Sequence, residues 1–249
     1  MGLFLTAFVA NTLSALSGGG AGLLQFPILL FLGLNFTTAL ATHKIASVAL
    51  GVGASIRHFR STKFDRNNVI HLLMFGLPGV IVGAYLVLEI PERIATFSLG
   101  FLTLGLAVYS WRQPKFGTQL IHKEFNLRQR LIGGSIVFII GVMNGSLTSG
   151  TGLFMTIWLV RHYGFDYKLA VAYTMIIVGL AWNGTGALTL ALQTYVAWDW
   201  LPALILGSVL GGFLGAHYSI KGGNHLIKRC FEFITASLGT SLLLKAYYL

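Results

Sequence analysis

The chain has 249 residues, of which 55% are hydrophobic and only 10% charged, with 17 lysines and arginines against 7 acidic residues and a formal net charge of +10. Soluble domains are about a quarter charged, so this composition excludes a soluble enzyme and predicts an all-α polytopic membrane protein. A nucleic-acid partner is not expected, because the positive charges of a membrane protein lie at the membrane edges and report its orientation.

The first apolar segment is interrupted near its middle. Residues 3–16 and 23–32 are apolar, and between them stands the small-residue run SGGGAG at residues 17–22. Each arm is too short to cross the hydrocarbon alone, and the glycines leave backbone groups that a bilayer tolerates only where protein, water or a ligand satisfies them. In transporters such breaks usually mark the substrate site, so we expect one here.

Three uninterrupted spans follow at residues 38–56, 69–88 and 94–111. The first contains Lys44, a cation that costs about 2.5–3.5 kcal/mol at the centre of a membrane helix and therefore needs a partner. No acidic residue lies at the centre of any predicted span, which leaves room for a substrate anion. The alternative is that Lys44 extends to the outer interface, about a turn and a half away.

A second interrupted segment starts at residue 131. Its apolar arms, residues 131–142 and 153–160, flank residues 144–152, which include Asn144, Ser149 and Thr151. Together with Ser17 and Gln25 of the first segment, these side chains offer hydroxyl and amide donors to an oxyanion; alternatively, they cap the broken backbone or bridge helices. Three further spans, at residues 169–193, 201–220 and 230–249, complete the chain.

The two halves of the chain repeat one unit. Residues 20–23 (GAGL) align with residues 150–153 (GTGL), and residues 79–84 (GVIVGA) with residues 211–216 (GGFLGA), so the offset drifts only from 130 to 132. We therefore predict one transmembrane domain at residues 1–249, with a first repeat at 1–112, a cytoplasmic linker at 113–130 and a second repeat at 131–249. Each repeat is a broken helical hairpin plus three transmembrane helices.

Glycines spaced by four residues occur in both halves. They are Gly79 and Gly83 in the first half, and Gly207, Gly211 and Gly215 in the second. This spacing puts small residues on one face of a helix, so we expect close helix packing there and no functional role.

The basic connections decide the topology. Residues 57–66, 112–130 and 221–229 are rich in Lys and Arg, whereas residues 89–93 and 194–199 have almost no basic excess. All three basic connections fall in the cytoplasm only if the second interrupted segment is a hairpin that returns to its own side. A hairpin plus three spans crosses the membrane an odd number of times, so we predict inverted-topology repeats with both termini outside, an arrangement typical of transporters.

The glycine motifs resemble those of a known family. The run SGGGAGLLQFP at residues 17–27, the following GL at 33–34 and ALAT at 39–42, and the second copy SGTG at 149–152 are similar to the sulfite exporter TauE/SafE family, also called the 4-toluene sulfonate uptake permease family. The resemblance covers essentially the whole chain. It implies a multi-pass secondary transporter of the bacterial plasma (inner) membrane for small sulfur oxyanions or sulfonates, such as sulfite.

Two departures from the family pattern bear on selectivity. Thr42-His43-Lys44 is similar to the Thr-Asn-Lys of one branch of the family, with His43 in place of Asn. In the second half, no proline follows the Gly152 motif, and Met175 stands where that branch often repeats its lysine. The resemblance therefore predicts two unequal half-sites.

We expect an anion transporter and not an enzyme, with no cofactor or metal, whose partners are a small anionic substrate and the lipid bilayer; a homodimer is left open. A membrane-embedded hydrolase is disfavoured because Gly-x-Ser-x-Gly is absent, and a non-transporting scaffold would not require duplicated breaks. The predicted substrate-binding residues are Ser17, Gly19, Gly20, Gly22, Gln25, Thr42, His43, Lys44, Asn144, Ser149, Gly150, Thr151 and Gly152.

Overall fold

The computed structural model describes residues 2–87, 92–112, 117–121, 123, 125–147 and 150–248. Every regular element in these ranges is helical, as the composition predicts. Five of the described helical stretches are long and apolar enough to cross a membrane: α3, α4, α6, the stretch from α8 to α9, and α10. The elements are α1 (Gly2–Ser17), α2 (Ala21–Phe31), α3 (Phe36–Ser61), α4 (Arg66–Leu86), α5 (Glu92–Arg112), α6 (Leu127–Leu147), α7 (Thr151–Trp158), η1 (Leu159–Tyr163), α8 (Tyr167–Thr174), η2 (Met175–Trp182), α9 (Asn183–Ala191), η3 (Trp198–Trp200) and α10 (Leu201–Tyr248).

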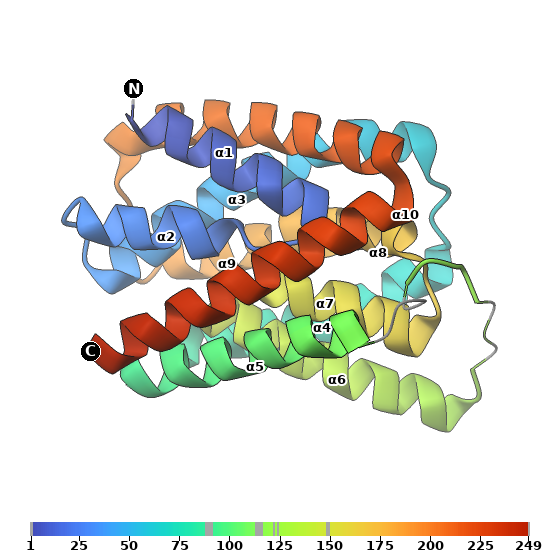
Figure 1. Cartoon of the computed structure of the whole chain (residues 1–249). Helices are drawn as coiled ribbons and strands as arrows, with labels where there is room; N and C mark the ends of the chain where they lie inside the picture. The colour runs from blue at the N-terminus through green and yellow to red at the C-terminus, as the bar shows by residue number, and fades with distance from the viewer. Residues whose placement is uncertain are drawn as a thin grey trace.

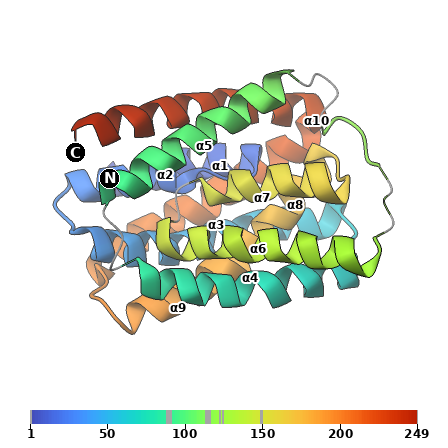
Figure 2. The same cartoon turned by 90° about the horizontal axis from the view of Figure 1, so that it is seen from below.

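The long helices lie side by side and share one general direction (Figures 1 and 2). Both chain ends lie at one end of this bundle, together with the end of α4 and the start of α5. The α3–α4 connection, the end of α5, the start of α6 and the bend of α10 lie at the opposite end. These are the places of the three Lys- and Arg-rich connections, so the structure groups them at one end, which we call the basic end.

Each interrupted segment forms a hairpin. α1 and α2 return to the end that holds the chain termini, whereas α6 and α7 return to the basic end (Figures 1 and 2). α1 ends, and α2 and α7 begin, at glycines with positive φ, which is 87° at Gly18, 151° at Gly19, 104° at Gly20 and 78° at Gly150. Residues with a side chain rarely adopt these angles, so glycine is what allows the backbone to turn here.

The first arm of the second hairpin is longer than the sequence predicts. We expected an arm too short to span, but α6 runs over Leu127–Leu147 and is long enough to cross a membrane by itself. Asn144 therefore lies inside a helix, and not in the break. The glycines of α6 remain helical because α4 packs directly on them: a Cβ added to Gly141 would lie 2.5 Å from the carbonyl oxygen of Gly76.

The span at residues 167–191 is also not the ordinary helix that we expected. It consists of α8, the π-helical stretch η2 and α9. π-helical turns are rare, because they leave the preferred hydrogen-bond spacing, and they frequently occur at functional sites. Here η2 faces the region where the two hairpins meet, as described below.

α10 contains the last two predicted spans in one helical element. Gly223, with φ 68° and ψ −174°, breaks it, and the chain reverses direction at the basic end (Figure 1). The predicted connection over residues 221–229 is present but shorter than expected, because helix continues on both sides of this glycine. Lys228 consequently lies within a helix, where it pairs with Glu232 one turn later at 2.8 Å.

The glycines spaced by four residues hold two pairs of helices together, as predicted. A Cβ added to Gly207 of α10 would lie 2.5 Å from the carbonyl oxygen of Phe4 in α1. Gly79 of α4 meets the carbonyl oxygen of Phe138 in α6 in the same way. Each first hairpin arm therefore packs on a glycine-lined helix from the other half of the chain.

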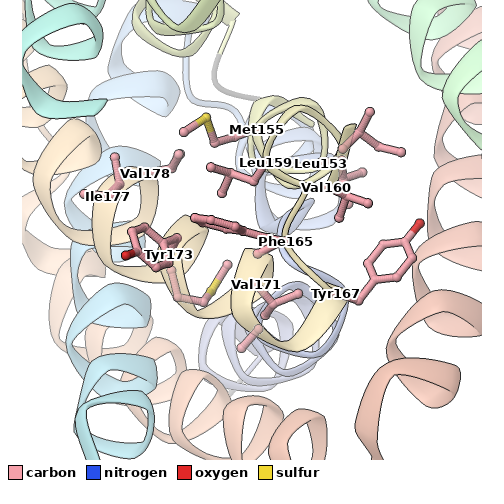
Figure 3. Close-up of a cluster of buried hydrophobic side chains, with 14 of the residues drawn as sticks. Leu153, Met155, Leu159, Val160, Phe165, Tyr167, Val171, Tyr173, Ile177 and Val178 are labelled. Carbon is pink, nitrogen blue, oxygen red and sulfur yellow. The ribbon is translucent and has the colours of Figure 1, made fainter. Parts of the chain in front are cut away.

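An apolar cluster fixes α7 against α8 and η2. Figure 3 shows Leu153, Met155 and Leu159, from α7 and its continuation, gathered with Phe165 and Tyr173. All five side chains are buried. This packing holds the N-terminus of α7 in place beside the first hairpin.

Candidate functional site

The two breaks in the chain touch each other. A Cβ added to Gly19 would lie 2.6 Å from the carbonyl carbon of Gly152 and from the amide nitrogen of Leu153. Such distances exclude any side chain, so backbone meets backbone where the hairpins converge. Thr156 of α7 joins the two, because its hydroxyl donates to the carbonyl oxygen of Gly18 at 2.9 Å.

A cavity lies at this junction, and we call it the central cavity. Its volume is about 30 Å³, room for about one or two water-sized groups. Both breaks, α3, α6 and η2 contribute to its lining, and within the described part of the chain no carboxylate does. The predicted site residues that line it are Gly19, Gly20, Gly22, His43, Asn144, Thr151 and Gly152.

Two helices begin at the central cavity. Gly20 is the N-cap of α2 and Gly150 is the N-cap of α7; both are left-handed, and neither makes a side-chain capping bond. The N-terminus of a helix carries a partial positive charge and backbone N–H groups that are not used within the helix. Two such ends at one small cavity favour a negatively charged occupant.

Asn144 connects the wall of the cavity to its surroundings. Its side-chain nitrogen donates to the hydroxyl of Thr151 at 3.0 Å and to Oδ1 of Asn183 at 3.3 Å. Its carbonyl oxygen and its Oδ1 accept from Nζ of Lys44 at 2.7 and 3.3 Å. The amide therefore links α6 to α7, α9 and α3 at a single point.

Lys44 is fully buried and lies behind the lining of the central cavity, on the far side of Asn144. The alternative in which it extends to the membrane interface is wrong, because its ammonium group bonds to α6 in the interior. The stem of Lys44 packs on α9, where a Cβ added to Gly186 would lie 3.0 Å from Cδ of Lys44. The cation can thus act on the cavity through Asn144 at short range.

His43 does face the central cavity. Its Nε2 lies 3.1 Å from the hydroxyl oxygen of Ser47, one turn later on α3. Its Nδ1 has no hydrogen-bond partner among the described residues. The ring and the hydroxyl together form the polar part of the α3 wall.

Two predicted side chains serve the backbone or other helices instead. The hydroxyl of Ser17 donates to the carbonyl oxygens of Leu13 and Gly19, both at 2.9 Å. Gln25 accepts from the side-chain nitrogen of Asn11 at 2.9 Å, bridging α2 to α1. For both residues the structure favours the capping or bridging role over contact with the central cavity.

Thr42 and Gly150 also do not line the cavity. The hydroxyl of Thr42 accepts from the backbone N–H of Ala197 at 3.1 Å, which ties α3 to the segment before η3. Gly150 acts as the left-handed N-cap of α7. Ser149 lies outside the described residues.

Several lining residues were not predicted from the sequence. Ser14, Ser47, Thr174 and Asn183 supply polar groups, and Met175 and Gly179 come from the π-helical stretch. Thr174 bonds through its hydroxyl to Thr156 at 2.9 Å. Only the internal repeat could have indicated them. Met175 aligns with Lys44, so the part of the second half around Met175 is expected to face the same cavity as the part of the first half around Lys44.

Comparison with known proteins identifies relatives along nearly the whole chain. The model of the sulfite exporter TauE/SafE family matches residues 3–242. A "Probable membrane transporter protein" of Haemophilus influenzae is 29% identical over 226 residues, which cover 91% of this chain and 87% of that protein. The "Probable membrane transporter protein YfcA" of Escherichia coli K12 is 26% identical over 242 residues, with 97% and 88% covered. No solved structure matches the chain.

Proposed function

The chain belongs to the sulfite exporter TauE/SafE family of membrane transporters, and on this premise we propose that it carries small sulfur-containing or organic anions, such as sulfite or sulfonates, across the bacterial plasma membrane. The observation that supports an anion most strongly is the contact between the two breaks. Two helix N-termini meet at one small cavity, a buried lysine lies behind its lining, and no described carboxylate lines it.

The size of the central cavity favours the smaller members of this substrate class. A volume of about 30 Å³ accommodates about one or two water-sized groups and leaves no space for an aromatic ring. A compact oxyanion such as sulfite matches it better than an aromatic sulfonate does. Larger sulfonates would require the two hairpins to separate.

The proposed substrate-binding groups fall into two layers. Gly19, Gly20 and Gly152 present backbone at the cavity, and Asn144 presents its amide. Lys44 stands behind this layer and supplies a positive charge through Asn144. Because the anion would be desolvated in so small a space, a cation in the low-dielectric interior contributes more to binding than it would in water.

We propose that the two halves of the chain are inverted repeats that exchange outward and inward access. The packing of α1 on the glycines of α10, and of α6 on the aligned glycines of α4, supports this proposal. Because each first hairpin arm packs closely on a helix of the opposite half, the two would move together when the halves exchange conformations. Such exchange is the basis of alternating access in repeat-built transporters.

We also propose that the basic end faces the cytoplasm, which puts both termini outside. The excess of Lys and Arg at that end supports the assignment. No titratable carboxylate lines the central cavity in the described chain, so the driving force would come from the membrane potential, a protonated substrate or a histidine such as His43.

Initial rates of uptake into proteoliposomes test the function. We expect uptake of labelled sulfite and small alkyl sulfonates, slower uptake of toluene sulfonate, and no uptake of a cation of similar size. The membrane potential and the pH gradient are varied separately. Equal rates in protein-free vesicles for every anion would reject the proposal.

A further inference from the structure

A second, larger cavity opens at the basic end, and we call it the vestibule. Its volume is about 450 Å³. Three cations from separate segments line it: Lys63 from the α3–α4 connection, Lys123 from the segment before α6, and Arg130 from α6 itself. The function proposed above assigns no role to this space.

Positive charge exceeds negative charge in the vestibule. Asp65 is the single carboxylate among its described lining residues, and its Oδ1 already caps α4 by accepting from the N–H of Asn68 at 2.8 Å. No described carboxylate lies within 4 Å of Lys63 or Arg130. The cations therefore face the space without being neutralised by a partner in the described chain.

Lys123 is held in place at the vestibule wall. Its Nζ donates to the carbonyl oxygens of Arg161 and His162 at 2.9 and 3.2 Å. Partial burial lowers the pKa of Lys123, and the positive charge of Arg161 lowers it further. An anion in the vestibule would relieve this repulsion between like charges.

Aromatic rings beside the central cavity form part of the vestibule lining. Phe165 and Tyr173 pack with their ring centres 4.9 Å apart (Figure 3), and both line the vestibule. The hydroxyl of Tyr173 accepts from the backbone N–H of Asp65 at 2.7 Å, which fixes the ring to the start of α4. The next residue of α8, Thr174, lines the central cavity, so the two spaces lie on consecutive residues of one helix.

We propose that the vestibule is a second anion-binding site, in which Lys63, Lys123 and Arg130 hold a hydrated oxyanion at the end of its path through the central cavity. The proposal rests on the function proposed above and extends it. The vestibule, at about 450 Å³, has about 15 times the volume of the central cavity, at about 30 Å³. The ion would keep its hydration shell in the vestibule and lose most of it in the central cavity. The three cations would raise the concentration of the anion in the vestibule.

The test compares three double variants of the full chain. Lys63→Gln with Arg130→Gln removes two vestibule charges, and Lys63→Arg with Arg130→Lys keeps them. Arg60→Gln with Lys221→Gln is the matched control, because these exposed cations lie at the basic end and outside the vestibule lining. Equilibrium binding of labelled sulfite to detergent-purified protein and initial uptake rates in zwitterionic-lipid vesicles are measured at several ionic strengths.

We expect the charge-removing variant to raise the apparent KM about three- to tenfold at low salt and to flatten its salt dependence, with the maximal rate within about twofold of wild type. Direct binding of sulfite should weaken by a similar factor. The charge-keeping variant and the control should behave like wild type. These results would establish the vestibule as an anion site.

Unchanged KM, binding and salt dependence in the charge-removing variant would overturn the proposal. The proposal would also be overturned if the charge-keeping variant lost as much sulfite binding and uptake as the charge-removing variant, because the effect would then depend on side-chain shape and not on charge. An effect that appears only when anionic lipid is added would assign the cations to lipid headgroups and also overturn it. Absence of wild-type uptake would reject the transport function, while the binding measurement would still decide on the vestibule.

Discussion

The ammonium group of Lys44 donates to the backbone carbonyl oxygen of Asn144 at 2.7 Å. This bond joins the first uninterrupted helix of the chain to the first arm of the second hairpin, and Asn144 in turn lines the central cavity. A lysine in the interior of a membrane protein is costly unless it has partners and a role. In the proposed function, Lys44 does not touch the anion and acts on it as a fixed charge behind the Asn144 amide.

Lys44→Met should lower the rate of anion uptake at subsaturating substrate by about 10- to 100-fold, since a unit charge near a desolvated ion contributes strongly in the protein interior. The same change at Lys221, which is exposed, should leave uptake within about twofold of wild type. Thermal unfolding and elution volume of the purified variants identify loss of fold. Wild-type uptake in a folded Lys44→Met variant would remove the lysine from the mechanism.

Gly19→Ala should abolish uptake and lower the midpoint of thermal unfolding, because the added Cβ would lie 2.6 Å from the backbone of Gly152. Overpacking of this kind costs about 1–3 kcal/mol. Gly33→Ala is the matched control: Gly33 also has a positive φ, 100°, but nothing lies within 4 Å of its added Cβ. Equal losses in the two variants would mean that backbone strain, and not the contact between the breaks, accounts for the effect.

Asn183→Asp tests the sign of the charge that the central cavity binds. Asn183 lines the cavity and accepts a hydrogen bond from Asn144, so a carboxylate there would repel an anionic substrate. We expect anion uptake to fall at least about tenfold, and Asn183→Ser to lose less than about threefold. If the aspartate variant takes up sulfite as fast as the serine variant, the cavity does not bind an anion.

Much of the fold follows from residues 17–22 and 150–152. Clusters of glycine in an apolar chain can be accommodated only where the helix stops, and the structure places positive φ at Gly18, Gly19, Gly20 and Gly150. The length of α6 could not be predicted, because Gly141 is indistinguishable in sequence from a helix-breaking glycine. Its helical state depends on contact with α4, and that contact exists only in three dimensions.

The site was predictable on the two hairpins and less so elsewhere. Gly19, Gly152 and Asn144 were found because the repeat aligned the breaks. Asn183 was not predicted, because nothing in the sequence distinguishes a single polar residue in an apolar span as a binding residue. It lines the cavity at the point where α9 follows the π-helical stretch. Ser149 lies outside the described residues and remains a prediction.

Labelling of single cysteines tests the orientation. The variants are made in a Cys230→Ser background, which removes the one native cysteine. Gly33, at the end that holds the termini, and Ser61, at the basic end, are both exposed, and each is replaced by cysteine in turn. A membrane-impermeant maleimide should label the first variant in intact cells and the second only after permeabilisation. The reverse pattern would place the basic end outside.

The position of a bound anion decides whether the junction of the two breaks is the binding site. Selenite has the shape and charge of sulfite and scatters anomalously, so crystals of the protein grown with selenite would reveal its position. We expect an anomalous peak in the central cavity, between Gly19 and Gly20 on one side and Thr151 and Gly152 on the other, within hydrogen-bond distance of backbone N–H groups. Selenite bound at full occupancy elsewhere, with none where the two hairpins meet, would contradict anion binding in the central cavity. So would a structure in which the glycines of the two hairpins face bulk solvent.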